Sequence, residues 1–123
     1  MFFDAPSTGS ANSEESYKGV GLDITEIIAP QKASTFFMQV GGNAMWRTGI
    51  FTKDIVTVDR SVIPSDGDVV VATIENDFVI RRLRKSGLLA WLETDGGRKF
   101  YLNEESSVEI WGVVTFSIHR IRE

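Results

Sequence analysis

The sequence predicts an all-β domain with one short helix near its N-terminal end. Short runs of β-branched, aromatic and other apolar residues recur between residues 35 and 118, and turn-forming residues separate them. Only one window, residues 23–28, carries helix signals. Many short strands at close spacing are typical of a compact all-β fold.

Residues 1–20 are predicted to form a flexible N-terminal arm, and residues 21–123 to form the folded domain. Residues 5–19 are mostly small and polar, with Tyr17 as their one aromatic residue. Such a segment buries too little apolar surface to offset the entropy of ordering it. The arm either frays or packs against a binding partner.

The predicted helix begins at Asp23 and ends before Pro30. Asp23 is a favourable N-cap, and Glu26 three residues later completes a variant of the capping box. Isoleucines at three of the positions from 24 to 28 give the helix one apolar face, and proline stops it.

The remaining elements are predicted strands. The run at residues 69–74 is continuously apolar, as expected for a strand covered on both faces. Residues 64–67 form a turn, and Asn76 and Asp77 suit a tight hairpin turn. Breaks are predicted at residues 85–87 and 95–97. The predicted strands are residues 35–40, 54–59, 69–74, 78–83, 88–92, a short one at 100–101, and 108–118.

Composition excludes several classes of protein. The 123 residues fit one domain, contain no cysteine and carry a net charge of −4, which disfavours direct nucleic-acid binding. No apolar run is long enough for a membrane span, and residues 1–4 do not open a signal peptide. We therefore expect a cytoplasmic protein.

The usual catalytic residues are nearly absent. The single histidine, His119, lies close to the C-terminus, so we expect it to have a surface role. No cluster of potential ligands suggests a metal, and no glycine-rich loop suggests a cofactor. The basic residues at 81–85 are interpreted as a solvated strand end rather than as a nucleic-acid contact.

Five segments together resemble the UmuD/LexA family of self-cleaving proteins, in order and with family-like spacing from about residue 17 to 118. Residues 42–45 (GNAM) fall where that family carries its Gly-x-Ser-Met nucleophile motif. The other four segments are residues 49–59, 67–72, 78–83 and 108–114. The resemblance implies the bent β-sheet of LexA and signal peptidases.

The chain departs from this family at both catalytic positions. The family cuts its own chain with a Ser-Lys dyad, and the matching positions here are Ala44 and Arg81. Alanine has no nucleophile, and arginine does not deprotonate in proteins, so it cannot act as the base. Residues 1–20 also lack the Ala-Gly or Cys-Gly bond that the family cleaves, and the length of the chain resembles processed UmuD.

The resemblance implies a homodimeric, inactive accessory subunit of a UmuC-like, Y-family DNA polymerase in the SOS response. A RecA filament is a further possible partner. One alternative is a regulator that pairs with an active UmuD- or LexA-like protein. The other is an S24 serine peptidase with a relocated nucleophile, which is Ser34, Ser61 or Ser65 beside Lys32 or Lys53.

Tryptophans are enriched at protein interfaces, and the chain has three. Trp46 follows the site motif on an expected exposed turn, which makes it a candidate contact residue. Trp111 lies in an apolar strand and is expected in the core or at a dimer interface. For Trp91 the expectation is core packing.

Overall fold

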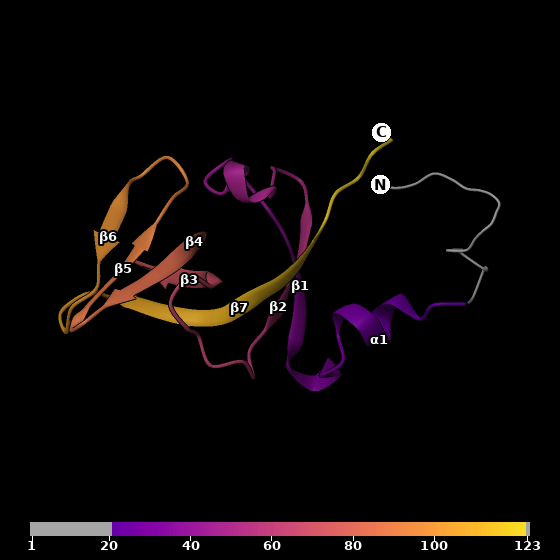
Figure 1. Cartoon of the computed structure of the whole chain (residues 1–123), viewed down its shortest axis with the longest axis horizontal. Helices are drawn as coiled ribbons and strands as arrows, with labels where there is room; N and C mark the ends of the chain where they lie inside the picture. Colours follow the sequence, from indigo (N-terminus) through magenta and orange to yellow (C-terminus); the bar gives the residue numbers. More distant parts are fainter. Residues whose placement is uncertain (1–20, 123) are drawn as a thin grey trace, which may run out of the picture.

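The computed structural model describes residues 21–122 and consists of one open antiparallel sheet with a single short α-helix (Figure 1). The sheet has seven strands in the order β1-β2-β7-β3-β4-β5-β6. This architecture confirms the predicted all-β class with one short helix, whereas the predicted arm lies outside the described residues. The strands are β1 Thr35–Gln39, β2 Ile55–Asp59, β3 Val69–Ile74, β4 Asp77–Ser86, β5 Leu89–Glu93, β6 Lys99–Tyr101 and β7 Val108–Ile118.

The helix α1 spans Ile24–Ile28, close to its predicted bounds. The side chain of Asp23 accepts a hydrogen bond from the Thr25 amide at 3.1 Å, which satisfies one free N–H of the first turn. Ile28 is the buried residue of this helix. Two short 3-10 turns complete the helical content of the described chain, η1 at Lys32–Ser34 and η2 at Trp46–Thr48.

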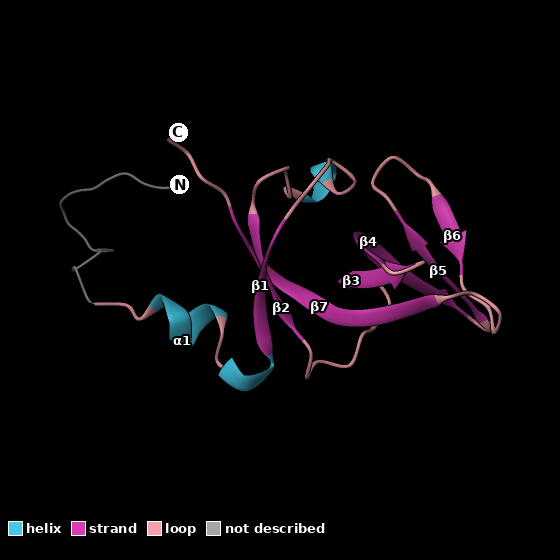
Figure 2. Ribbon diagram, turned by 180° about the vertical axis from the view of Figure 1, so that it is seen from behind, coloured by secondary structure: helices cyan, strands magenta, loops and turns pink. Residues whose placement is uncertain are grey.

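Strand β7 joins the two halves of the sheet. Its first half pairs with β3, from Val108 to Val113, and its second half pairs with β2, up to Ile118. β-Bulges interrupt both ladders, and the long strand curves across the molecule (Figure 2). At Gly112 the neighbouring strand approaches so closely that a Cβ atom would lie 2.6 Å from a methyl carbon of Val58.

Each half of the sheet has its own apolar core. One core lies around strand β2 and the site loop, and the other lies between β3, β4, β5 and β7. The first contains Val40, Met45, Ile50, Val56, Val58, Val71 and Ile80; the second contains Val70, Ala72, Leu83, Leu92 and Val113. β3 serves both cores because its alternate residues face opposite sides, which explains its continuous apolar run.

Two turns differ in position from the sequence prediction. The hairpin between β3 and β4 turns at Glu75 and Asn76, with φ values of 53° and 73°, and Asp77 is already the first residue of β4. Lys85 and Ser86, predicted as a break, are the last residues of β4 and pair with β5. In both places the strands pair over more residues than the turn-forming residue types predicted.

A buried carboxylate fastens the end of β7 to the start of β2. Asp54 is only 2% exposed, and its oxygens accept from the Phe51 amide at 2.9 Å and the Ser117 hydroxyl at 3.3 Å. The Nδ1 atom of His119 lies 2.6 Å from the same carboxylate. Burial by itself would raise the pKa of Asp54, but the hydrogen bonds from His119, Phe51 and Ser117 outweigh it and lower this pKa.

This arrangement gives stability a defined pH dependence. Because the pKa of Asp54 is lowered from 3.8 on folding, its stabilising contribution is fully present above that pH and is lost as pH falls through the folded-state pKa. We expect Asp54→Asn to lower the free energy of unfolding by about 1–3 kcal/mol at pH 7, and this difference to shrink on acidification.

Urea denaturation of both proteins between neutral pH and pH 3 measures this difference. The control is Glu104→Gln, at an exposed position on the loop before β7, for which we expect little change at any pH. A difference between wild type and Asp54→Asn that grows toward acid pH would contradict this account of Asp54.

Candidate functional site

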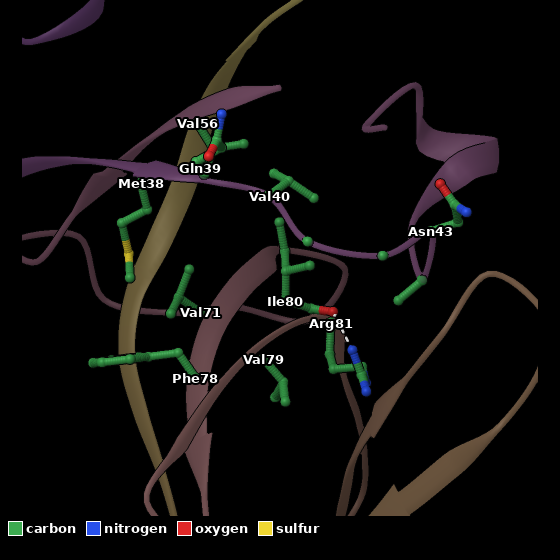
Figure 3. A pocket seen from close by; sticks show the side chains of 13 residues that line it. Met38, Gln39, Val40, Asn43, Val56, Val71, Phe78, Val79, Ile80 and Arg81 are labelled. Atoms are coloured by element: carbon green, nitrogen blue, oxygen red, sulfur yellow. Dashed lines mark hydrogen bonds between the residues drawn. The ribbon is translucent and has the colours of Figure 1, made fainter. Parts of the chain in front are cut away.

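A cavity of about 300 Å³ lies between the end of β1, the loop that follows it and the first half of β4 (Figure 3). It opens above the apolar core around β2, so its inner wall is aliphatic. The lining residues are Met38, Gln39, Val40, Gly41, Gly42, Asn43, Ala44, Val56, Val71, Phe78, Val79, Ile80 and Arg81. The two positions predicted from the family dyad, Ala44 and Arg81, therefore line one cavity.

The loop that carries Ala44 is held in place by contacts from distant strands. The Ala44 carbonyl accepts from the amide of Asp95, in the turn between β5 and β6, at 2.8 Å. The carboxylate of Asp95 in turn accepts from the Thr48 amide, also at 2.8 Å. Met45, next to Ala44, is 1% exposed and anchors the loop in the core. The backbone of Ala44 is thus held in place by Asp95 and by the burial of Met45.

Basic residues of β4 contribute to the same scaffold. Arg82 donates to the Gly67 carbonyl and to the Thr48 hydroxyl, both at 2.7 Å. Arg84 donates to the carboxylate of Asp66 at 3.0 Å. These side chains make intramolecular contacts that connect β4 to neighbouring loops.

Arg81 lies at the rim of the cavity, at the edge of β4. Its guanidinium donates to the carbonyl of Ile80 at 2.7 Å, as Figure 3 shows. Burial, and to a lesser degree the nearby charge of Arg98, lowers the pKa of Arg81 from its ordinary value. A guanidinium still has five donors and no lone pair for accepting a proton. The cavity thus offers a methyl group from Ala44 and a cation from Arg81, and neither of these can act as a nucleophile or a base.

The serines considered as relocated nucleophiles have different partners. The hydroxyls of Ser34 and Ser61 both contact the carboxylate of Asp59, at 3.2 Å and 2.6 Å. Hydrogen bonds from the side chain and amide of Ser61 are the main cause of a lowered pKa at Asp59. Within residues 21–122, no lysine amine forms a hydrogen bond with a serine hydroxyl. These contacts give Ser34 and Ser61 a structural role in fixing Asp59.

His119 is the residue whose contacts sequence reasoning missed. It is half exposed, as a surface role requires, but its Nδ1 atom is bound to the buried Asp54. The ring edge also meets Phe51, with centroids 5.7 Å apart. No local pattern signals this pair, because 65 positions separate the two residues in sequence. The pair lies outside the set of residues that line the cavity.

Trp111 lies in a cluster of aromatic side chains from three strands. Its ring centre is 5.1 Å from that of Phe36 in β1 and 5.6 Å from that of Phe78 in β4. The guanidinium of Arg60 lies 4.4 Å above the ring. Phe36 and Phe78 are 43% and 53% exposed, so the cluster presents a large apolar area to solvent.

The other two tryptophans differ in exposure. Trp46 is the first residue of the 3-10 turn that begins two positions after Ala44. It is 47% exposed, and the guanidinium of Arg47 lies 5.0 Å from its ring centre. Trp91 is half-buried, and its indole nitrogen donates to Glu93 at 2.9 Å. Trp46 is thus the tryptophan most available to a partner beside the cavity.

The structure also bears on metal binding and on membrane spanning. In the described part of the chain, no group of three or more histidine, cysteine or acidic side chains is placed to hold a metal ion. Among the helices of residues 21–122, none has the length and apolar character needed to cross a membrane.

Comparison with known proteins gives consistent relatives over the whole chain. A family model described as Peptidase S24-like matches residues 3–115. Protein ImpA of Salmonella typhimurium is 31% identical over 123 residues, covering 100% of this chain and 85% of the relative. Protein MucA of Salmonella typhimurium is 34% identical over 114 residues, covering 91% and 78%. The LexA repressor of Haemophilus ducreyi is 33% identical over 60 residues, covering 49% and 28%.

Proposed function

Since the chain belongs to the peptidase S24-like family, we propose that it is a catalytically inactive, UmuD-like accessory subunit of a Y-family DNA polymerase. The accessory role in the SOS response is what resemblance to UmuD implies. The observation that supports the proposal is that one cavity is lined by both Ala44 and Arg81, the two residues that the resemblance matches to the family nucleophile and base. A protein of this family without the dyad acts through binding.

The chemistry of self-cleavage explains why both substitutions matter. Family cleavage needs a serine hydroxyl whose proton passes to a neutral lysine kept uncharged by burial. Ala44 supplies no oxygen for attack on a peptide carbonyl. Arg81 stays charged and accepts no proton, so restoring the serine alone would leave it without a base.

We also propose that the protein is a homodimer, built on the outer face of β2 and β7. Phe37, Thr57 and Phe116 lie in one cross-strand row, and Ile118 lies in the next row. Phe37, Phe116 and Ile118 are 54%, 41% and 44% exposed. Beyond Val113, β7 has no strand on the side opposite β2 within the described chain, so its edge is available to a second copy.

The first prediction concerns cleavage. On prolonged incubation of the full chain with an activated RecA filament, we expect mass spectrometry to find no internal cut. Ala44→Ser combined with Arg81→Lys is necessary for restoring cleavage, so neither single variant is expected to cut itself. Cleavage of the unmodified chain at any bond within residues 1–20 would contradict the proposed inactivity.

The second prediction concerns assembly. Phe116→Asp places a charge in the exposed apolar face and is expected to convert the dimer to a monomer, because burying an unpaired charge at an interface is costly. The matched control is Ile63→Asp, at an 84% exposed position in the loop between β2 and β3, which should stay dimeric. Analytical ultracentrifugation of both variants and the unmodified chain measures this, and a dimeric Phe116→Asp would refute the proposed face.

The third prediction tests the accessory role itself. Affinity purification of the tagged protein from its own host after DNA damage is expected to recover a Y-family DNA polymerase, identified by mass spectrometry. Trp46→Ala is expected to reduce that recovery, because an exposed tryptophan is a typical anchor at interfaces, whereas Ile63→Ala is expected to leave it unchanged.

Other outcomes of this purification would assign a different role. Recovery of only an intact UmuD- or LexA-like protein would replace the accessory role by that of a regulator of an active relative. Recovery of neither class of protein would overturn both.

A further inference from the structure

Arg81 borders a second cavity beside the first. This cavity, of about 170 Å³, lies between β4, the end of β5 and β6, and its floor is apolar. Its lining residues are Ile74, Arg81, Leu92, Thr94, Arg98, Lys99 and Phe100. Two guanidinium-bearing residues, Arg81 and Arg98, thus meet at one small cavity in a chain whose net charge is −4, whereas the amine of Lys99 lies 5.2 Å from the centre of the Trp91 ring.

The two guanidinium groups have no carboxylate partner within residues 21–122. The ion pairs of that part of the chain join Arg84 to Asp66 and Glu93, and the hydrogen-bonded pair of His119 and Asp54 lies elsewhere. The side chain of Arg81 donates only to the neighbouring carbonyl of Ile80. A partly buried guanidinium beside a second one is unfavourable unless an anion joins them, as the lowered pKa of Arg81 indicates.

The adjoining cavity has the walls of a strand-binding groove. Residues 77–81 of β4 pair with β3 on one side only, because pairing with β5 begins at Arg82. On the opposite wall, β1 is the edge strand of the sheet. Both free edges expose backbone groups to the same cavity, and an extended polypeptide satisfies such groups by adding a strand.

We propose that the groove binds an extended segment of a partner protein and that Arg81 and Arg98 together bind an aspartate or glutamate side chain of that segment. This proposal rests on the proposed function and deepens it, since it assigns partner recognition to the cavity that holds the replaced dyad. Arginine binds carboxylates through paired N–H groups, which lysine cannot do. The Arg81 position then has a recognition role in place of a catalytic one.

A polypeptide fits these features better than a nucleic acid does. A nucleic-acid groove needs cations along a track, whereas here they cluster at one end of an otherwise apolar cavity. The strand edges also supply hydrogen-bonding groups with the spacing of another strand. The neighbouring aromatic cluster of Phe36, Phe78 and Trp111 extends the apolar surface available to such a segment.

The test uses a library of random peptides displayed on phage and selected on the purified full-length protein. We expect the selected peptides to share an acidic residue at a fixed position next to apolar residues. A selected peptide with blocked ends is then measured by fluorescence anisotropy. Replacing its acidic residue by the amide, or Arg81→Gln in the protein, is each expected to weaken binding about tenfold.

Three variants make the result specific. The loss of affinity from Arg81→Gln and the loss from changing the acidic residue of the peptide to its amide are expected not to add when combined, because both changes remove the same contact. Arg98→Gln should weaken binding in the same way, whereas Arg120→Gln, an exposed arginine outside both cavities, should not. Thermal melting followed by circular dichroism confirms that each variant is folded, and Arg81→Lys should retain part of the affinity because it keeps the charge.

Several outcomes would overturn the proposal. These are selection without an acidic preference, unchanged affinity in folded Arg81→Gln, or displacement of the peptide by a single-stranded oligonucleotide at low concentration. A rise in affinity when Glu14 and Glu15 are both changed to glutamine would assign the site to the chain's own acidic residues instead. Because the assay uses only purified protein, its failure is distinguishable from failure to recover a polymerase.

Discussion

The fold depends on one constraint, which is that β7 must pair with β3 along its first half and with β2 along its second. A straight strand cannot lie in register with both, so the two ladders are interrupted by bulges and the sheet bends between them. Gly112 lies where this bend brings β2 closest, and a side chain there would collide with Val58. The bend places β1 and β4 on opposite walls of one groove, and the candidate site follows from it.

The groove is held by contacts that involve neither a serine hydroxyl nor a lysine amine. Ala44 is fixed through Asp95 and Met45, and Arg81 belongs to a strand whose residues 77–82 pair with β3. The methyl group of Ala44 and the guanidinium of Arg81 therefore line one cavity on a backbone that other residues hold in place.

Most of this fold could be predicted from the sequence, because the residues with apolar strand patterns are also the residues that the sheet buries. The continuous apolar run at residues 69–74 predicted β3, and Asp23 predicted the start of the helix. Turn positions were less predictable: at Glu75 a left-handed conformation is imposed by strand pairing, against the preference of glutamate. Lys53 is a similar case, with φ of 75° in the turn before β2.

The site was predictable only in part. Its two central positions came from the resemblance to the family motifs, but the hydrogen bond of His119 with Asp54 and the meeting of Arg81 with Arg98 depend on contacts between distant parts of the chain. Residue types alone do not indicate such contacts, since histidines and arginines near strand ends are usually solvated.

The contacts of the Asp95 carboxylate with Thr48 have a consequence for interpreting mutational data, because a substitution removes them while the backbone bond from the Asp95 amide to the Ala44 carbonyl remains. Asp95 does not line the cavity, yet it also binds Thr48, so it holds the loop from two sides. A scan of single substitutions would record a loss at Asp95 that resembles damage to the groove itself. Residues that affect the groove therefore include Asp95 in the turn between β5 and β6, although this residue lies outside the surface that a ligand would contact.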